Sequence, residues 1–322
     1  MKTILVTGSN GLLGQKIIYG LLGDPFCILP DDIRKKIKSE VQIIACGKGE
    51  NRLHRKDGYI YESLNVTNKS EIEKIVAKHK PDVVINTAGM TNVDACETKK
   101  EECWNANVTA VQNMVDVLSN LKTQISNLHF IHLSTDFIFD GMKRAPYDEN
   151  DTPNPLHYYA LSKYEGEKIV MASKLKWSII RTIIIYGVVD DKSRSNLVLW
   201  VKNNLEKKKK INVITDQFRA PTLSEDLAQG CILTAMKGAK GIFHISGRET
   251  HSILDWAYMI ADFWKLDKSF INPVSSEELN QPAKRPPMTG FILDKARKVL
   301  GYNPHSFMEG LEIVDIQLTI NK

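Results

Sequence analysis

The sequence predicts a doubly wound α/β fold, in which helices cover both faces of a parallel sheet. Three observations support this prediction. Short runs rich in β-branched residues alternate with stretches of helical periodicity, which is typical of a parallel sheet. These runs are almost continuously apolar, as strands are when both of their faces are buried. A glycine-rich turn joins the first run to the first helical stretch, as it does in doubly wound folds.

The expected elements follow one another in a regular order as far as Gly187. The helix over 70–80 is expected to begin at Ser70 as its N-cap, with Glu73 three residues later completing a capping box. The connection before the second strand is unusually long and contains Pro25 and Pro30. Strands are expected over 3–7, 41–46, 82–86, 128–134 and 177–185, and helices over 11–22, 70–80, 101–121 and 162–173.

The alternation of elements loosens after Gly187. Prolines and polar loops separate short helices such as 253–264, while 241–246 is expected to return to the main sheet as one more strand. A smaller substrate domain is therefore predicted to be interleaved with the first domain. The assignment is 1–187 plus roughly 224–247 for the first domain, and roughly 188–223 and 248–322 for the second.

The composition is that of an ordinary globular protein. The chain has 322 residues, of which 25% are charged, and a net charge of +5, which suits an anionic ligand without requiring a nucleic acid. The four lysines over 207–210 follow an apolar helical stretch, and this favours a solvated helix end over a polyanion site. The five cysteines are scattered and lack C-x-x-C spacing, so neither a disulfide framework nor a zinc site is indicated.

No run of the sequence approaches the roughly 20 uninterrupted apolar residues of a membrane span. The chain also begins directly with an expected strand rather than with a signal-peptide pattern. We therefore expect a cytoplasmic protein that binds neither a membrane nor a nucleic acid.

Three glycines spaced as G-x-x-G-x-x-G stand between the first expected strand and the first expected helix. Glycine permits a tight turn and lets backbone N–H groups approach a pyrophosphate, which the helix N-terminus attracts. The first domain is therefore expected to be a Rossmann domain that binds NAD(P). The residues of this turn are the expected contacts: Gly8, Asn10, Gly11, Leu12, Leu13 and Gly14.

The residues after the second strand favour NADP over NAD. An acidic residue there would accept hydrogen bonds from the ribose 2′-hydroxyl and repel a 2′-phosphate. The sequence instead has Cys46, Gly47 and Lys48, with Arg52 close behind and no acid before Glu50. This basic loop predicts NADPH as the cofactor. The alternative is that Lys48 and Arg52 merely face solvent, and binding of NAD then stays open.

Tyr159 and Lys163 form a Y-x-x-x-K pair near the start of an expected helix. A phenol has a pKa near 10 and is a poor acid–base group unless its anion is stabilised. A lysine four residues later lies one helical turn away on the same face, so its ammonium can lower the phenol pKa and hold ribose hydroxyls. The preceding strand ends at Thr135, whose hydroxyl can hydrogen-bond a substrate carbonyl.

Taken in order, these residues resemble the extended form of the short-chain dehydrogenase/reductase superfamily. Further blocks, each modest alone, resemble the dTDP-4-dehydrorhamnose reductase group. They span nearly the whole chain: 86–97 (NTAGMTNVDACE), 134–141 (STDFIFDG), 146–159 (PYDENDTPNPLHYY), 181–187 (RTIIIYG), 216–227 (DQFRAPTLSEDL) and 285–286 (RP).

The resemblance implies a role for each matching residue. Tyr159 would be the proton donor, Lys163 its electrostatic and ribose partner, and Thr135 the hydroxyl that orients the carbonyl. Asn65 stands where the family usually has an aspartate that touches adenine, and Ala88 and Gly89 would border the dinucleotide. The substrate-binding residues implied in the same way are Thr135, Asp136, Asn196, Gln217, Pro221 and Arg285.

Several of these assignments have simpler alternatives. Asp136, together with Asp140, could instead shape its loop through side chain-to-backbone hydrogen bonds. Arg285 offers a guanidinium fork that suits phosphate oxygens, although a surface ion pair is an open alternative. His157, close to Tyr159, is expected to be a solvated loop residue.

The resemblance predicts an enzyme of nucleotide-sugar metabolism, as in dTDP-rhamnose biosynthesis. NADPH would reduce the C4 carbonyl of a dTDP-4-keto-6-deoxysugar, and Tyr159 would protonate the resulting alkoxide. One alternative is a non-catalytic dinucleotide-binding subunit that resembles the methionine adenosyltransferase beta subunit; another is an epimerase or reductase of a different nucleotide sugar. A homodimer is compatible with the resemblance. Lys16 stands where the family's metal-linked dimers need an acidic side chain, so no essential metal is expected.

Overall fold

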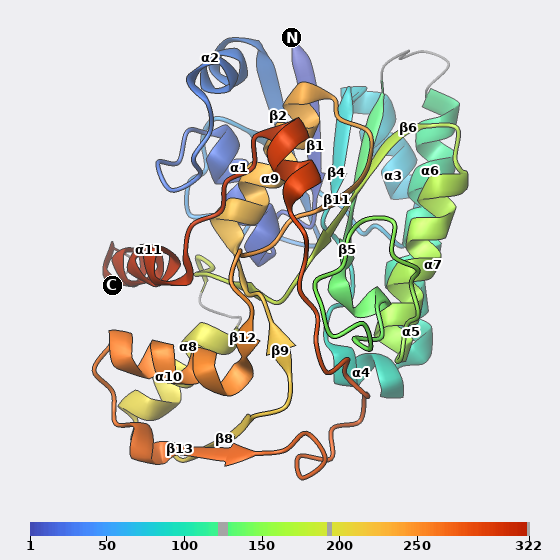
Figure 1. Cartoon of the computed structure of the whole chain (residues 1–322). Helices are drawn as coiled ribbons and strands as arrows, with labels where there is room; N and C mark the ends of the chain where they lie inside the picture. The colour runs from blue at the N-terminus through green and yellow to red at the C-terminus, as the bar shows by residue number, and fades with distance from the viewer. Residues whose placement is uncertain (122–127, 192–194, 321–322) are drawn as a thin grey trace.

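The computed structural model describes residues 1–121, 128–191 and 195–320. Seven strands of this described chain form one sheet in the order β3-β2-β1-β4-β5-β6-β11, and every neighbouring pair runs parallel (Figure 1). The predicted doubly wound α/β fold is therefore confirmed. The strands are β1 (Lys2–Thr7), β2 (Val41–Gly47), β3 (Ile60–Ser63), β4 (Val83–Asn86), β5 (His129–Thr135), β6 (Lys176–Thr182) and β11 (Gly241–His244).

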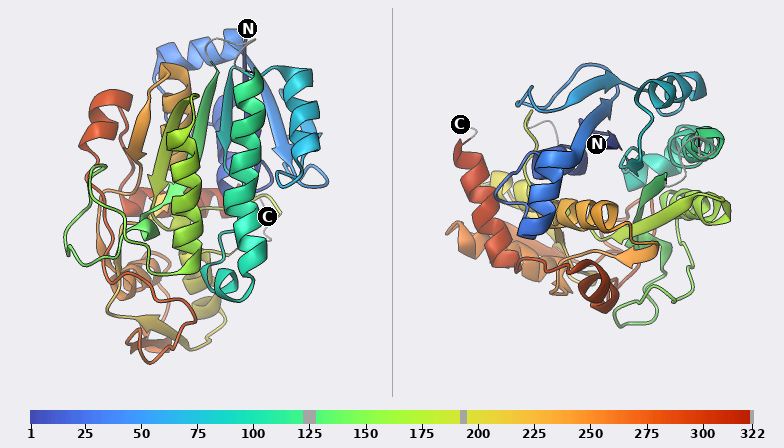
Figure 2. Two further views of the ribbon diagram at one scale, coloured as in Figure 1. Left: turned by 90° about the vertical axis from the view of Figure 1, so that its right-hand side faces the viewer. Right: turned by 90° about the horizontal axis from the view of Figure 1, so that it is seen from above.

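Helices cover both faces of the sheet (Figure 2). On β1, Ile4 and Val6 belong to one hydrophobic core, while Leu5 between them belongs to the other, because successive side chains of a strand point to opposite faces. The first core is closed by α1 (Leu12–Leu21), α2 (Asp31–Glu40) and α9 (Ser224–Lys237). The second core is closed by α3 (Lys69–His79), α6 (Ala110–Leu121) and α7 (Tyr158–Ala172).

The helix α3 begins earlier than predicted, and its N-cap is Asn68 rather than Ser70. The Asn68 Oδ1 atom accepts hydrogen bonds from the N–H groups of Ser70 and Glu71 at 3.1 and 3.4 Å. Its Nδ2 atom donates to the carboxylate of Glu71 at 2.9 Å. The prediction of Ser70 is wrong because asparagine caps a helix at least as well as serine and stands two residues closer to the preceding turn.

One helix was not predicted, and another differs from its predicted limits. The connection that contains Pro25 and Pro30 holds α2, which begins directly after Pro30 and buries Ile33 and Ile37. The helix predicted over 101–121 is divided into α5 (Lys100–Trp104), a π-helical turn at Asn105–Thr109 and α6; α4 (Val93–Thr98) precedes it. The prediction of an irregular connection over 23–40 is therefore wrong in part, and the single helix over 101–121 is interrupted at Asn105–Thr109.

A smaller lobe lies below the sheet in Figure 1. Its apolar side chains form a third core around the fully buried Trp256. The lobe consists of α8 (Leu197–Glu206), β8 (Ile211–Ile214), β9 (Phe218–Arg219), β12 (His251–Ser252), α10 (Ile253–Phe263), β13 (Ile271–Val274) and α11 (Phe307–Ile320). β7 (Ile185–Tyr186) and β10 (Thr222–Leu223) link it to the sheet.

The two regions are interleaved along the chain. After β10, the chain returns to the sheet through α9 and β11, and β11 pairs with β6 as expected for 241–246. Phe291, Leu293, Leu300 and Tyr302 also pack into the first core of the sheet, so part of 248–322 belongs with the larger region in packing.

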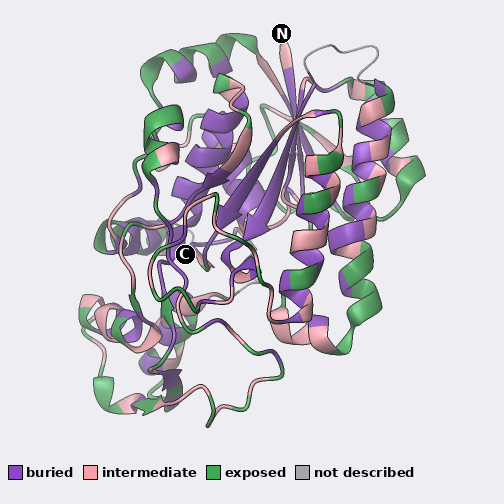
Figure 3. Cartoon of the chain, turned by 45° about the vertical axis from the view of Figure 1, so that its right-hand side comes forward, coloured by how far each residue is buried: buried purple, intermediate pink, exposed green. Residues whose placement is uncertain are grey.

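Burial follows these layers. In Figure 3 the central strands of the sheet are buried along most of their length, whereas the outer faces of the covering helices are exposed. No helix in the described ranges is both long enough and apolar enough to cross a membrane.

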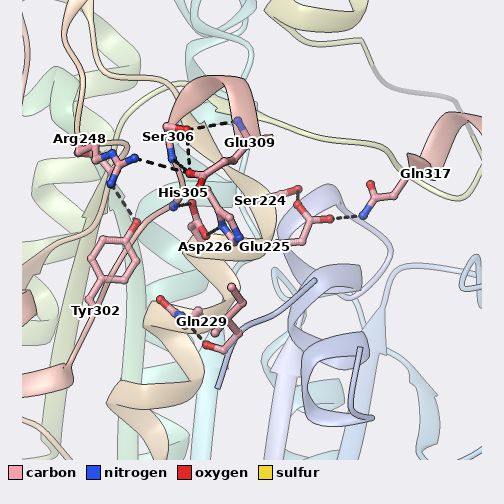
Figure 4. A network of polar contacts seen from close by, with 12 residues as sticks. Ser224, Glu225, Asp226, Gln229, Arg248, Tyr302, His305, Ser306, Glu309 and Gln317 are labelled. Carbon is pink, nitrogen blue, oxygen red and sulfur yellow. Dashed lines mark hydrogen bonds and ion pairs between the residues drawn. The ribbon is translucent and has the colours of Figure 1, made fainter. Parts of the chain in front are cut away.

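A polar cluster at the N-terminus of α9 joins the sheet region to the C-terminal helix (Figure 4). Glu225 binds the ammonium of Lys16 at 3.0 Å and accepts a hydrogen bond from the side-chain amide of Gln317 at 2.6 Å. Asp226 contacts Nδ1 of His305 at 2.6 Å. Lys16 is therefore occupied by an internal ion pair. Among residues 1–121, 128–191 and 195–320, no three His, Cys, Asp or Glu side chains gather to hold a metal ion.

Candidate active site

The carboxyl ends of β1, β4 and β5 meet where the strand order of the sheet reverses. β1 pairs with β2 on one side and with β4 on the other. Ligands of open α/β sheets bind in the crevice that forms at such a point. The glycine turn after β1, the loop after β4 and Thr135 at the end of β5 all lie along this edge.

The glycine turn is constrained to glycine at two of its positions. Gly8 has a φ of +71°, and a Cβ on Gly14 would lie 2.3 Å from the carbonyl oxygen of Gly8. Gly11 is the N-cap of α1, but no described side chain caps this helix, and its first turn carries no acid. Leu12 and Leu13 open the helix, and its first N–H groups retain a partial positive charge that suits an anion.

The side chain of Asn10 holds the loop that follows β2. Its Nδ2 atom donates to the carbonyl oxygen of Glu50 at 2.8 Å, and its Oδ1 atom accepts from the N–H of Arg52 at 3.0 Å. Lys48 in this loop is exposed, and the side chain of Arg52 is 53% exposed with a carboxylate oxygen of Asp191 at 3.7 Å. Both basic side chains are therefore accessible at the predicted position of the 2′-phosphate.

The loops after β3 and β4 border the same crevice. The Oδ1 atom of Asn65 accepts from the hydroxyl of Thr67 at 2.9 Å, so this side chain shapes its own turn. A Cβ on Gly8 would lie 2.9 Å from the backbone nitrogen of Ala88, which places these two loops in contact. Gly89 is exposed, and a Cβ there would lie 2.9 Å from Oδ1 of Asn107.

Tyr159 and Thr135 are brought together at the start of α7. Tyr159 is 8% exposed, and its phenol lies beside the side chain of Thr135. Burial raises the pKa of the phenol, and the contact with Thr135 opposes this effect only in part. The charge of Asp136 adds to the rise, and Lys163 is not among the groups that shift this pKa, so the lowering by Lys163 stays a prediction. A phenol that stays protonated at neutral pH can act as a proton donor.

Lys163 lies one turn after Tyr159 and is 7% exposed. Burial lowers the pKa of its ammonium to about 8, while the carboxylate of Glu167 one turn further along α7 opposes this shift. Glu167 is itself held by Arg181 in a buried ion pair of 2.8 Å. Within the described chain, no hydrogen bond or ion pair engages the ammonium of Lys163. Its donors are therefore available to a ligand hydroxyl.

Asn107 is a central residue of this site that the sequence reasoning missed. Its Oδ1 atom accepts from the N–H of Met90 at 2.8 Å, and its Nδ2 atom donates to Oγ of Ser162 at 3.0 Å. Ser162 in turn donates to the carbonyl oxygen of Tyr159 at 2.7 Å. Asn107 thus joins the loop after β4 to α7. The available signal was a pair of asparagines inside a predicted helix, where asparagine is unfavourable; the structure has a π-helical turn there.

His157 is not the solvated loop residue that the sequence suggested. It is 7% exposed and is the N-cap of α7, where its Nδ1 atom accepts from the N–H of Ala160 at 3.2 Å. Its ring is nearly parallel to that of Tyr159 and meets Phe137 edge-on. Burial lowers its pKa to about 4. The expectation is wrong because the imidazole, as a neutral acceptor, can satisfy the start of a helix.

Two predicted substrate residues are engaged by other side chains. Asp136 is 2% exposed, and its carboxylate accepts hydrogen bonds from the hydroxyls of Thr135 and Thr289. Arg285 forms an ion pair of 2.8 Å with Asp94, and its side chain is 15% exposed. Arg285 therefore forms the ion pair that was the alternative to phosphate binding, although its side chain is half-buried rather than on the surface. The side chain of Asp136 binds two hydroxyls instead of shaping its own loop.

The remaining predicted substrate residues differ in how free they are. Asn196 is the N-cap of α8, and both ends of its amide bind backbone groups, at Leu199 and Gly187. Pro221 is buried, with its carbonyl oxygen against Gly247. Gln217 is 6% exposed, and its side-chain amide makes no hydrogen bond to the described residues. Of these three side chains, Gln217 is the one with polar atoms left for a ligand.

Comparisons with known proteins show the family of this chain. The family model described as RmlD substrate binding domain matches residues 1–318. The dTDP-4-dehydrorhamnose reductase of Aggregatibacter actinomycetemcomitans is 29% identical, over 97% of this chain and 98% of that protein. Methionine adenosyltransferase 2 subunit beta of Danio rerio is 27% identical, over 88% of this chain and 81% of that protein.

A solved structure gives the same result for the fold. The dTDP-4-dehydrorhamnose reductase from Bacillus anthracis, solved in complex with NADP, superposes with a TM-score of 0.78 at 24% identity, over 98% of this chain and all of that one. The match of the family model over nearly the whole sequence decides membership. The chain belongs to the RmlD substrate-binding-domain family, within the extended short-chain dehydrogenases/reductases of the dTDP-4-dehydrorhamnose reductase group.

Proposed function

We propose that this protein is an NADPH-dependent oxidoreductase that reduces the C4 carbonyl of a dTDP-4-keto-6-deoxysugar. The observation that carries the proposal is the arrangement at the start of α7. The protonated phenol of Tyr159 contacts Thr135, and the unengaged ammonium of Lys163 lies one turn away. Curated relatives of similar length that are named dTDP-4-dehydrorhamnose reductase support the substrate class.

The residues at the edge of the sheet fit a dinucleotide. The glycine turn leaves no room for a side chain at Gly8 and Gly14, and the uncapped N-terminus of α1 suits a diphosphate. Exposed Lys48 supports a preference for the 2′-phosphate of NADP, and Asn65 offers an amide to adenine. NADPH, when bound, supplies the hydride that reduces the carbonyl.

Three side chains of this chain perform the acid–base work. The Tyr159 hydroxyl orients the carbonyl oxygen by a hydrogen bond and gives its proton to that oxygen as negative charge develops. The Thr135 hydroxyl donates to Asp136 in this structure, and it must turn from that carboxylate to donate to the carbonyl oxygen. The ammonium of Lys163 binds ribose hydroxyls and stabilises the phenolate that is left behind. Because burial keeps the phenol protonated, Tyr159 is poised as the acid in the direction of reduction.

The nucleotide sugar is assigned to the face between the sheet and the smaller lobe. Arg285 and Gln217 are the residues best suited to contact it, since a guanidinium binds phosphate oxygens in a bidentate manner and the amide of Gln217 has free polar atoms. We assign dinucleotide binding to 1–187 plus roughly 224–247, and substrate binding to roughly 188–223 and 248–322. A cytoplasmic location, a homodimer and the absence of an essential metal stay predictions from the sequence.

A second function is favoured by one observation, the match to methionine adenosyltransferase beta subunits. In that case the dinucleotide site would serve a regulatory subunit that docks on a partner enzyme. The contact between Tyr159 and Thr135, together with an unengaged Lys163, supports catalysis instead, because a docking subunit has no need of a proton donor. An epimerase or a reductase of another nucleotide sugar would use the same three residues.

The direct test is to follow oxidation of NADPH by the purified protein with a panel of nucleotide-linked 4-keto sugars, in dTDP and UDP forms. Turnover of a dTDP-4-keto-6-deoxysugar is expected, and Tyr159→Phe serves as the matched control that lacks one oxygen atom. Turnover of a UDP sugar alone would move the assignment to another nucleotide. If NADPH binds but no sugar in the panel is reduced, the regulatory function replaces the catalytic one.

A further inference from the structure

A buried line of hydroxyl and carboxylate contacts lies behind Thr135. The Thr135 hydroxyl donates to Oδ1 of Asp136 at 3.1 Å, and the Thr289 hydroxyl donates to Oδ2 of the same carboxylate. Thr135, Asp136 and Thr289 are 6%, 2% and 0% exposed. One buried carboxylate therefore receives a hydroxyl from the end of β5 and a hydroxyl from a segment 153 residues further along the chain.

Thr289 is held in place by the smaller lobe. The N–H of Thr289 donates to the carbonyl oxygen of Phe218 in β9 at 3.0 Å, and the N–H of Phe218 donates to the carbonyl oxygen of Pro287 at 2.8 Å. β9 itself pairs with β12 of that lobe. The position of the Thr289 hydroxyl therefore depends on how segment 286–289 is seated on the smaller lobe.

Arg219 keeps the carboxylate available as an acceptor. This arginine is 2% exposed, donates to the carbonyl oxygens of Pro286 and Pro287, and stacks on Phe137 at 5.3 Å. Burial raises the pKa of Asp136, and the charge of Arg219 is the largest effect that opposes this rise. This buried carboxylate faces a cation and accepts hydrogen bonds from two hydroxyls. Hydrogen bonds to a charged acceptor are stronger than those between neutral groups.

The contact with Asp136 fixes the direction of the Thr135 hydroxyl. A hydroxyl has one hydrogen and two lone pairs. In Thr135 the hydrogen is directed to Asp136, and the oxygen also accepts from the N–H of Phe137 at 3.2 Å. The phenol of Tyr159 lies beside this hydroxyl. A substrate carbonyl only accepts, so Thr135 must turn its hydrogen away from Asp136 to bind it, and a change at Asp136 would alter how readily it turns.

We propose that Asp136 is a positioning residue, which makes the orientation of the Thr135 hydroxyl depend on the seating of Thr289 and segment 286–289. The inference rests on the proposed reductase function, and it gives that function a link between the lobe and the reacting centre. Arg285 directly precedes the segment. A nucleotide sugar bound by Arg285 would therefore affect the contacts that hold Thr289 in place. Binding in the lobe would in this way be transmitted to the hydroxyl that orients the carbonyl.

The test is a double-mutant cycle on turnover between Thr289 and Thr135. Thr289→Val removes the hydroxyl with little change of shape, and Thr289→Ser retains it as the matched control. In the otherwise wild-type protein, Thr289→Val should lower kcat about tenfold, the size expected from losing a hydrogen bond to a charged group. It should leave KM for NADPH unchanged, and Thr289→Ser should restore most of kcat.

In the Thr135→Val background, Thr289→Val should change the residual kcat by less than about twofold, because its effect acts through the missing hydroxyl. A merely structural role of Thr289 would lower kcat by the same factor in both backgrounds. Equal factors would overturn the proposal while leaving the reductase function intact.

A second measurement does not depend on turnover. The N–H of Phe137 donates to Oγ1 of Thr135, so hydrogen exchange of a peptide that covers 135–139 reports on that hydroxyl. This peptide should exchange several-fold faster in Thr289→Val than in Thr289→Ser, with exchange in β1 unchanged. Equal exchange at 135–139 in both variants would overturn the proposal. If the wild-type protein reduces no sugar, the proposed function fails, and the exchange experiment alone decides the coupling.

Discussion

Two buried polar clusters of this protein differ in how completely their groups are paired. In the structural cluster (Lys16, Glu225, Asp226, His305 and Gln317), the charged groups bind one another across α1, α9 and α11 (Figure 4). In the catalytic cluster (Thr135, Tyr159 and Lys163), the ammonium of Lys163 has no acceptor within the described chain.

This difference distinguishes a cluster that stabilises the fold from one that binds ligands. A buried polar group without a partner costs about 1–3 kcal/mol, and at a ligand site the ligand can supply the missing partner. Next to the catalytic cluster, Nε2 of His157 is also buried without a partner. We infer that the structural cluster fixes the α9 N-terminus against α1 and α11, whereas the catalytic cluster is completed by cofactor and substrate.

The largest effect is expected from breaking the structural cluster. Lys16→Met removes the cation that faces Glu225, which is 1% exposed. An uncompensated buried charge costs about 3–5 kcal/mol, and the free energy of unfolding in urea should fall by that amount. Lys69→Met, which breaks an exposed pair with Asp116, is the control and should cost at most about 1 kcal/mol. Equal losses in the two variants would contradict the role given to the cluster.

Removal of the Arg285 guanidinium should weaken nucleotide binding. Charge-assisted bonds from a guanidinium to phosphate are worth about 1.5–3 kcal/mol, so Arg285→Ala should weaken the affinity for dTDP roughly 10- to 150-fold. Calorimetric titration into the NADPH-loaded protein measures this change. Asp94→Asn is the control, because it frees the guanidinium from its 2.8 Å ion pair and should not weaken binding. Equal dTDP affinity of wild type and Arg285→Ala would remove Arg285 from the pocket.

The charge of Lys163 should give dinucleotide binding a pH dependence. Its pKa is lowered to about 8 by burial, below the ordinary 10.4 of lysine, so the folded protein loses this charge as pH rises through about 8. NADPH affinity should then fall about fivefold, since a neutral amine makes weaker hydrogen bonds than an ammonium. Fluorescence titrations between pH 6.5 and 9.5, on the order of one unit either side of the transition, measure the change. The same slope in Lys163→Met would show that another group titrates.

The smallest effect is expected at the basic loop after β2. Lys48 and Arg52 are exposed, so solvent screens their charges and each contributes little to the affinity for the 2′-phosphate. The double variant Lys48→Ala/Arg52→Ala should narrow the ratio of NADPH to NADH affinity by about threefold to tenfold. A wild-type protein that binds NADH more tightly would show that the basic loop does not select the cofactor.

Local patterns in the sequence were sufficient for most of the sheet and for the glycine motif. The periodicity of apolar runs predicts β1, β2, β4, β5, β6 and β11 but not β3, whose residues are half-buried or exposed. The carbonyl oxygen of Gly8 constrains Gly14 within the same turn, whereas the neighbours of Gly8 are Thr87 and Ala88 in the loop after β4. The spacing of Tyr159 and Lys163 was enough to place both on one face of α7. Apart from the space around Gly8, these features depend on residues that are close in the chain.

The contacts that could not be predicted join distant segments. Asp136 meets Thr289 across 153 positions, and Arg285 meets Asp94 across 191. Spacing carries no information on such pairs, and a carboxylate alone does not reveal which hydroxyl it will bind. The start of α7 was missed for a different reason, because a histidine N-cap at His157 is uncommon among the residues that usually begin helices.

The most direct test of the central claim is a pair of measurements on Tyr159→Phe. Loss of the phenol oxygen should reduce reduction of the sugar by about 100-fold or more, while NADPH still binds. The free energy of unfolding should change by no more than about 1.5 kcal/mol, the upper value for one hydrogen bond. An unchanged turnover number in this variant, measured with wild-type affinity for NADPH, would contradict the assignment of Tyr159 as the proton donor.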